Sequence, residues 1–289
     1  MESLHGLGVA LVTPFDDNLE IDFPALAKVL DHLYASKAVD YLVVLGSTGE
    51  AAALSAAEKQ AVLTFVKDHN KGRLPLLFGH SGNNTPELVK TLNAIDCTGY
   101  AAVLSASPAY VKPPQDGIIA HYQQLADNSP LPILLYNVPS RTGSNMTAGT
   151  TLTLAGHENI IGIKEASGNV EQALAIRAGS EDSFLLISGD DMLTVPLCSV
   201  GATGLISVLG NAYPGVYKDI LTLCSKGNYR QAAGIAARTI AINELMYSEG
   251  NPVGIKQLLA AMALCRPNVR LPLVKASQSL AEKIQANLL

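Results

Sequence analysis

The chain has 289 residues, of which 48% are hydrophobic and 16% are charged, so it can bury a large core, and this composition excludes a disordered chain. The formal net charge is −5 and no basic run occurs, which argues against nucleic acid or an anionic membrane surface as the main partner. The four cysteines are widely separated and form no CxxC pair, which is typical of reduced core residues in a cytosolic protein.

Eight short apolar runs are typical of β-strands, because turn residues bound each of them. Most are apolar throughout rather than alternating, which is expected of parallel strands that are covered on both faces. These runs are residues 8–12, 41–45, 75–79, 101–105, 132–136, 160–164, 184–188 and 203–208.

Helical patterns separate these strands, for example at residues 23–37, 55–71, 85–97, 116–127 and 170–178. Ser55 and Glu58 form a capping box, which predicts the start of one helix, and Asn84 with Pro86 predicts another. Strands that alternate with helix-sized segments predict parallel pairing through crossover helices. The count of eight predicts an α/β fold, a closed (β/α)8 TIM barrel.

The barrel is expected to be the catalytic domain and to occupy residues 1–225. The following residues, 226–289, are rich in alanine and leucine and predict three helices at 229–248, 252–265 and 273–287. Turn signals around Asn251 and Pro267 separate them. We expect a C-terminal three-helix domain that is appended to the barrel, with no linker and no second core.

The N-terminal segment, residues 1–6, lacks the basic and apolar regions of a signal peptide. No apolar run approaches the roughly 18 residues that a transmembrane helix needs. We therefore expect a cytoplasmic protein that has no membrane partner.

Lys164 ends the sixth predicted strand, where an apolar run gives way to a turn of small residues. A lysine in apolar surroundings loses hydration of its ammonium form, which favours the neutral amine. A neutral amine attacks ketones and forms a Schiff base. The alternative is a lysine that extends to the surface from the end of a strand.

Other candidate residues also follow strand ends, where the active site of a βα barrel forms. Ser47 and Thr48 lie between glycines after the second strand, and they suit a small carboxylate or simply form a tight turn. Tyr136 ends the fifth strand, and a tyrosine there can move protons or fill the core. Tyr110 and Arg141 follow in the loops after the fourth and fifth strands.

Metal and nucleotide chemistry have little support in the sequence. The six histidines do not cluster, and only His80 falls at a strand end. Asp190 and Asp191 follow the seventh strand and would repel a phosphate at that position. No GxGxxG motif follows a strand. We expect no metal and no cofactor other than a covalent lysine imine.

Seven motifs occur in an order that is highly specific: GVALVTPF, GSTGE, SPAYVKP, YNVPSRTG, IIGIKEASGN, SGDD and GLISV. Together they resemble the class I aldolases of the dihydrodipicolinate synthase and N-acetylneuraminate lyase type, over essentially the whole chain. This resemblance implies a (β/α)8 barrel with a C-terminal helical domain. It also implies a homotetramer that is built from two tight dimers.

The resemblance assigns roles to the candidate residues. It implies that Lys164 forms the Schiff base with pyruvate and that Tyr136 moves protons at the imine. Ser47 and Tyr110 match the partners of a proton relay, with Tyr110 crossing from the neighbouring subunit. Thr48 and the backbone of Ile206 match pyruvate-binding positions.

Arg141 matches the arginine that holds the carboxylate of aspartate semialdehyde in the synthases, whereas neuraminate lyases usually lack it. The resemblance thus implies a lyase that condenses pyruvate with L-aspartate 4-semialdehyde to 4-hydroxy-tetrahydrodipicolinate, the first committed step of lysine and diaminopimelate biosynthesis. Ser47 departs from the threonine that is usual in synthases. The alternatives are cleavage of N-acetylneuraminate or of a 2-keto-3-deoxy sugar acid, and a catalytically silent barrel that acts as a binding or scaffolding protein.

Many synthases bind lysine as a feedback inhibitor through histidines on the helix after GSTGE and through an aromatic residue beside the relay tyrosine. Those positions match Ala56, Lys59 and Ala109 here, and Asn83 and Glu87 match the rest of the site. Lys59 would repel the ammonium group of lysine. We therefore expect feedback inhibition by lysine to be weak or absent.

Overall fold

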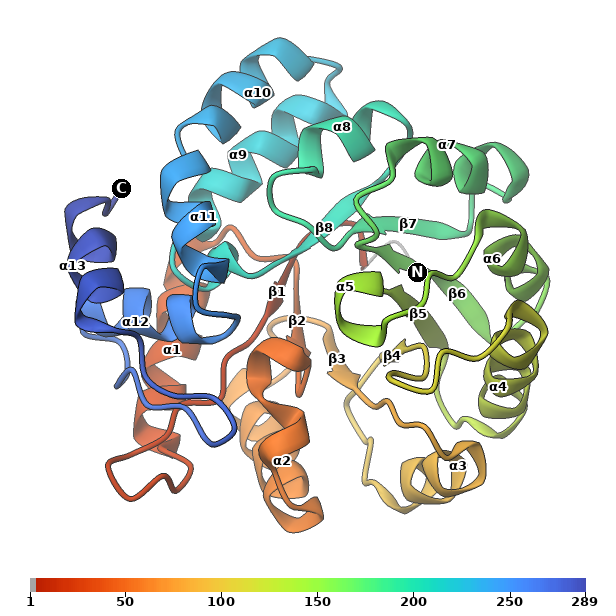
Figure 1. The fold of residues 1–289 in the computed structure, drawn as a ribbon, viewed down its shortest axis with the longest axis horizontal. Helices are drawn as coiled ribbons and strands as arrows, with labels where there is room; N and C mark the ends of the chain where they lie inside the picture. The colour runs from red at the N-terminus through yellow and green to blue at the C-terminus, as the bar shows by residue number, and fades with distance from the viewer. Residues whose placement is uncertain (1–3) are drawn as a thin grey trace.

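The computed structural model describes residues 4–289, and within them eight parallel strands close into a barrel in chain order (Figure 1). The predicted (β/α)8 barrel is confirmed. Residues 1–3, which begin the segment expected to lack a signal peptide, lie outside the described residues. The strands are β1 (Gly6–Ala10), β2 (Tyr41–Val44), β3 (Leu76–Gly79), β4 (Ala102–Ala106), β5 (Ile133–Asn137), β6 (Ile160–Glu165), β7 (Leu185–Ser188) and β8 (Gly204–Ser207).

The first strand lies two residues earlier in the chain than its apolar pattern predicts. Leu11 and Val12 are buried like strand residues, but they follow β1. The Val12 backbone N–H donates to Asn211 Oδ1 at 3.3 Å rather than to a neighbouring strand. Burial therefore continues beyond the point where the chain leaves the sheet, and an apolar pattern alone cannot mark that point.

Helices cover the outside of the barrel (Figure 1). The predicted capping box is confirmed: Ser55 Oγ accepts from the Glu58 N–H at 3.2 Å, and Glu58 Oε2 accepts from the Ser55 N–H at 2.8 Å. The barrel helices are α1 (Phe23–Ser36), α2 (Ala56–Asn70), α3 (Thr85–Ala94), α4 (Gln115–Asn128), α5 (Pro139–Thr142), α6 (Ala148–Ala155), α7 (Val170–Gly179), α8 (Thr194–Ser199) and α9 (Pro214–Ser225). The loops contain the 3₁₀ turns η2 (Ser47–Gly49), η3 (Ala51–Ala53) and η4 (Leu209–Asn211).

The C-terminal segment forms four helices, so the predicted count of three is wrong. They are α10 (Tyr229–Ala237), α11 (Ile240–Tyr247), α12 (Val253–Ala261) and α13 (Gln278–Ala286). The expected helix at 229–248 is interrupted at Thr239, whose hydroxyl donates to the Ala236 carbonyl at 2.8 Å and competes with the helical backbone bonds. The last helix starts late because Ser277 caps it and accepts from the Leu280 N–H at 3.1 Å.

The buried faces of these four helices belong to the same apolar core as the helices that surround the barrel. This arrangement agrees with an appended set of helices and no second core. The division at residue 225 itself stays a prediction. No helix within residues 4–289 combines the length and the apolar character that crossing a membrane requires.

A buried ion pair joins α12 to the loop after β2. Lys256 Nζ contacts Glu50 Oε1, and both side chains are almost completely shielded from solvent, at 0% and 2% exposure. Lys256 Nζ also donates to the Asn268 carbonyl at 2.9 Å, while Glu50 Oε2 accepts from the Arg270 N–H at 2.9 Å. Burial lowers the pKa of Lys256, and the neighbouring Glu50 carboxylate opposes that shift. The pair fixes the C-terminal helices against the carboxyl ends of the strands.

Candidate active site

A cavity of about 890 Å³ opens at the carboxyl ends of the strands. Such a volume is large enough for two small substrates. Its walls include side chains that sequence analysis predicted to meet at the barrel mouth: Ser47, Thr48, Tyr136, Arg141 and Lys164. Tyr110 and Ile206 do not line it.

Lys164 and Tyr136 lie side by side on the inner face of the barrel. They occupy paired positions on β6 and β5, and Lys164 Nζ is 4.4 Å from the centroid of the Tyr136 ring. Only 5% of Lys164 and 9% of Tyr136 is exposed. Lys164 therefore does not extend to the surface. An amine beside a phenol, both almost completely buried at the bottom of a cavity, is suited to imine chemistry that needs proton transfer.

Ser47 and Thr48 lie in η2, directly after β2. Ser47 is exposed to the cavity mouth, whereas Thr48 is buried. Thr48 Oγ1 accepts a hydrogen bond from Asn251 Nδ2 at 3.0 Å. Asn251 comes from the junction of α11 and α12, and sequence analysis treated it only as part of a turn.

Arg141 lies on α5, the short helix at the end of β5 (Figure 1). Gly143 ends this helix with a φ of 78°, a left-handed conformation that glycine adopts without steric cost. The Arg141 guanidinium donates to the Asn251 carbonyl at 3.4 Å. Asn251 therefore contacts both Thr48 and Arg141, and no local signal in the sequence indicates this link across more than a hundred residues.

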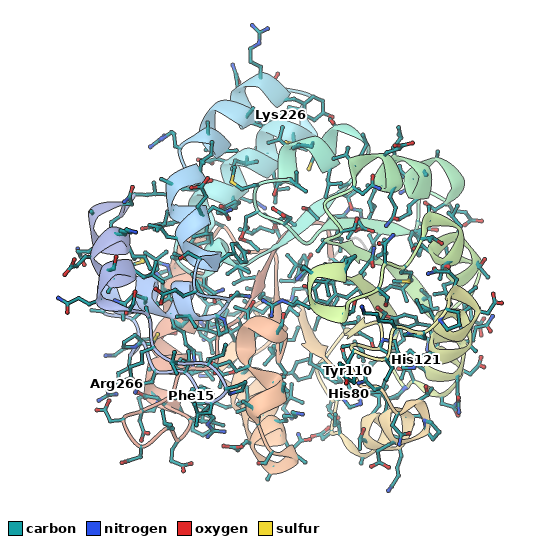
Figure 2. All side chains as sticks on the ribbon, viewed as in Figure 1. Phe15, His80, Tyr110, His121, Lys226 and Arg266 are labelled. Atoms are coloured by element: carbon teal, nitrogen blue, oxygen red, sulfur yellow. The ribbon has the colours of Figure 1, made fainter. Side chains whose placement is uncertain are left out.

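Tyr110, labelled in Figure 2, is 89% exposed on the loop after β4. It does not line the cavity of its own chain. The backbone of this loop is held in place, because the Tyr110 N–H donates to the Thr142 carbonyl at 3.0 Å and Tyr110 has a φ of 69°. Ile206 is fully buried in β8, where it pairs with Gly8 and packs in the barrel interior. Neither side chain reaches the cavity in this chain.

Asp190 and Asp191 hold the loops after β7 and β8. Asp191 is 2% exposed, and it accepts from the Ser207 hydroxyl and from the N–H groups of Val208 and Leu209 at 3.1 Å each. Burial raises the pKa of Asp191 to about 6, although these hydrogen bonds favour its ionised form. Asp190 Oδ1 accepts from the Met192 N–H at 2.8 Å. Both carboxylates are therefore engaged by loop groups.

The positions that match a lysine regulatory site line the outer part of the same cavity. They are Ala56, Lys59, Asn83, Glu87 and Ala109. Asn83 Oδ1 accepts from the Ala109 N–H at 2.9 Å, so the loop after β4 is tied to this wall. The expected weakness of lysine inhibition stays a prediction.

Possible metal ligands do not gather at the mouth. Within the described part of the chain, no three His, Cys, Asp or Glu side chains are grouped as a metal site would require. His80 lines the cavity, but its Nε2 lies 3.0 Å from the Leu88 carbonyl, and burial lowers its pKa. This contact gives His80 a structural partner.

Comparisons with known proteins agree with this fold and point to one family. The sequence model of the dihydrodipicolinate synthetase family matches residues 3–289. The chain is 45% identical over 285 residues to a 4-hydroxy-tetrahydrodipicolinate synthase from Cytophaga hutchinsonii, covering 99% of this chain and 96% of that one. It is 47% identical over 278 residues to one from Porphyromonas gingivalis, covering 96% and 93%. A solved structure of chloride-inhibited dihydrodipicolinate synthase from Acinetobacter baumannii, complexed with pyruvate, has a TM-score of 0.94 at 31% identity and covers 98% and 97% of the two chains.

The raised pKa of Asp191 predicts a pH-dependent contribution to stability. Because the folded state favours the protonated carboxyl, this contribution is fully present below the ordinary pKa of an aspartate and is lost as the pH rises through about 6. The stability of the wild type relative to Asp191→Asn, which cannot ionise, should therefore fall by about 3 kcal/mol between about pH 3 and about pH 7. Urea unfolding of both proteins across this range measures it. A difference that does not change with pH would contradict the assignment.

Proposed function

The chain belongs to the dihydrodipicolinate synthetase family, and we propose that it is a lyase of the class I aldolase type that condenses pyruvate with L-aspartate 4-semialdehyde. The product is 4-hydroxy-tetrahydrodipicolinate, and one water molecule is released. This reaction is the first committed step of lysine and diaminopimelate biosynthesis. The observation that carries the proposal is Lys164 Nζ beside the Tyr136 ring, in a cavity that also holds Arg141.

The first step is imine formation. The neutral amine of Lys164 attacks the keto carbon of pyruvate, and the carbinolamine loses water as Tyr136 moves protons through Ser47 and Tyr110. The carboxylate of pyruvate binds to Thr48 and to the backbone of the turn and of Ile206. The bond from Asn251 to Thr48 supports this role, because Thr48 Oγ1 acts as an acceptor there and its hydroxyl proton is available for the carboxylate. No cofactor is needed, since the imine itself withdraws electrons from the methyl carbon that loses its proton.

The second step forms the carbon–carbon bond. Loss of a methyl proton converts the imine to an enamine, whose terminal carbon attacks the aldehyde of L-aspartate 4-semialdehyde. Arg141 binds the carboxylate of this substrate through charge-assisted hydrogen bonds. The amine of the substrate then attacks the imine carbon, which closes the ring and releases Lys164 as a free amine.

Cleavage of a sialic acid or of a 2-keto-3-deoxy sugar acid would use Lys164 and Tyr136 in the same way. Arg141 favours the synthase, because a polyol tail needs neutral hydroxyl partners rather than a cation. The compared proteins carry the synthase name. A silent scaffold fits poorly, because every position that the chemistry needs has a competent side chain.

We also propose that the enzyme is cytoplasmic and forms a homotetramer of two tight dimers, in which Tyr110 completes the active site of the neighbouring subunit. The 89% exposure of Tyr110 supports this arrangement, since an exposed aromatic ring on an anchored loop is suited to an interface. Ser47 and Tyr136 lie in the cavity of one subunit and would receive the third hydroxyl from the other.

The direct test is a coupled assay with pyruvate and L-aspartate 4-semialdehyde, in which a dihydrodipicolinate reductase consumes NAD(P)H. We expect turnover by the wild type. We expect none by Lys164→Ala, because Lys164 carries the amine that lies beside Tyr136 inside the barrel. Borohydride treatment with pyruvate, followed by mass spectrometry, should add one reduced pyruvyl group to the wild type and none to the variant. A trapped adduct on the variant would show that another residue is the nucleophile.

Replacing Arg141 by alanine separates the two substrates. Losing the charge-assisted bonds should raise the KM for L-aspartate 4-semialdehyde by about tenfold to a hundredfold, and the KM for pyruvate should stay within about twofold. Steady-state kinetics with each substrate varied measures both values. Lys112→Ala is the matched control, because it removes an exposed positive charge that does not line the cavity. Equal losses for both substrates would argue against the proposed role.

The crossing of Tyr110 can be tested with mixed dimers. Tyr110→Phe and Lys164→Ala are each expected to be nearly inactive alone. A dimer with one subunit of each kind would contain one complete site, namely the Lys164 of one subunit and the Tyr110 of the other. Unfolding and refolding the two variants together should therefore restore activity. If mixing restores none while the dimers form, Tyr110 acts in its own subunit or not at all.

A further inference from the structure

A buried polar cluster lies on the outer face of β5 and β6, behind the two residues of the proposed chemistry. Successive side chains of a strand point to opposite faces. Asn137 follows Tyr136 and Glu165 follows Lys164, so these two residues pair outside the barrel as Tyr136 and Lys164 pair inside it. Asn137 is 0% exposed and Glu165 is 1% exposed. Burying a carboxylate costs free energy unless its charge is compensated, so the burial of Glu165 needs an explanation.

Glu165 accepts hydrogen bonds from three neutral donors. Its Oε2 lies 3.0 Å from Asn137 Nδ2 and 3.0 Å from Gln172 Nε2, and its Oε1 lies 2.5 Å from the Ser167 N–H. The ion pairs found in residues 4–289 do not include Glu165. The carboxylate is therefore stabilised by donors on β5, on α7 and in the turn after β6.

The side-chain amides of Asn137 and Gln172 cannot flip by 180° without losing other hydrogen bonds. Asn137 Oδ1 accepts from the Met146 N–H at 3.0 Å, and Gln172 Oε1 accepts from Asn145 Nδ2 at 2.8 Å. Their N–H₂ ends are therefore directed at Glu165. Only a side chain that accepts and does not donate satisfies them all.

The pairing of β5 with β6 needs such support. Ile133 pairs with Ile160, but Leu134 pairs with Gly162, so the register shifts near the start of the two strands. Because of this irregularity, the hydrogen bonds at the start of the two strands do not by themselves fix which residues pair at their carboxyl ends. The bond between Asn137 and Glu165 lies at the opposite end, next to Tyr136 and Lys164.

We propose that Glu165 is a positioning residue whose bond to Asn137 locks the carboxyl ends of β5 and β6 together and so holds Lys164 against Tyr136. The proposal rests on the proposed function only in that Lys164 forms the imine with Tyr136 as its proton carrier. Lysine has a long flexible stem, so the position of its backbone relative to β5 limits where the amine can lie. Proton transfer between the two groups tolerates only a small displacement.

The test reverses the direction of this hydrogen bond. Glu165→Gln places an amide opposite the amide donors, so at least one donor loses its partner. The double variant Asn137→Asp/Glu165→Gln restores the bond between β5 and β6, because the new carboxylate at 137 accepts from the new amide at 165 and from the Met146 N–H. The oxygen of the amide at 165 keeps the Ser167 N–H, whereas Gln172 Nε2, which bonds the other oxygen of Glu165, loses that bond and keeps the Met146 carbonyl. The donation from residue 137 to Asn145 Oδ1 is also lost.

We expect Glu165→Gln to lower kcat and the rate of borohydride-trappable imine formation with pyruvate by about a hundredfold, because misplaced groups react slowly. The KM for L-aspartate 4-semialdehyde should change much less than kcat, since Arg141 is held by the backbone bond of α5 to Val138 and by the Asn251 carbonyl rather than by Glu165. The double variant should regain at least about a tenth of the wild-type rate. Leu154→Ala, a cavity in the buried core at α6, is the control: it should lower the unfolding temperature and leave kcat within about twofold.

Unchanged imine formation in Glu165→Gln would overturn the proposal, and so would a folded double variant that regains no activity. If either variant fails to fold, Asn137→Ala removes the β5 half of the bond and should slow imine formation similarly; an unchanged rate would overturn the proposal. A wild type that traps pyruvate but does not turn over L-aspartate 4-semialdehyde would refute the proposed condensation alone, because imine formation still reports on Glu165.

Discussion

The active site depends on one constraint: the register of the parallel pairing between β5 and β6. Because that register places residue 136 opposite residue 164, the amine of Lys164 lies inside the barrel 4.4 Å from the centroid of the Tyr136 ring. The same alternation turns Asn137 and Glu165 outward, where no substrate reaches them. The residues of the proposed chemistry and those of its proposed support therefore occupy neighbouring positions on the same two strands. In this proposal, the loops need only bring the groups that recognise the substrates.

Those recognition groups come from distant parts of the chain. Thr48 follows β2, Arg141 lies on α5, and Asn251 from the C-terminal helices contacts both of them. In the proposed reaction, two carboxylate-bearing substrates would therefore find a guanidinium and a hydroxyl in a protein whose formal net charge is −5. Their binding would be governed by a few local charges at short range, which the low dielectric constant of a largely buried site strengthens.

Features that depend on local sequence were predictable. The strands, the capping box at Ser55 and the gathering of Lys164, Tyr136, Ser47, Thr48 and Arg141 all follow from periodicity and from the rule that strand ends face one mouth. Contacts between remote segments were not predictable: neither the bond of Asn251 to Thr48 nor the burial of Lys256 has a local signature. The break at Thr239 depends on a single hydroxyl bond that outweighs helix periodicity. Tyr110 lies in the loop after β4, as predicted, but its exposed side chain does not line the cavity of its own chain.

The ion pair between Glu50 and Lys256 couples the unfolding of the C-terminal helices to the unfolding of the barrel. A barrel deprived of α12 would leave Glu50 without the ammonium group of Lys256, and removing one partner of a buried ion pair costs about 3–5 kcal/mol, a large share of the stability of a typical domain. The C-terminal helices and the barrel should therefore unfold in one cooperative transition, although they are distinct in architecture. Removing the last helices would not yield a smaller working barrel. It would disturb the turn that carries Thr48, since Glu50 belongs to the same loop.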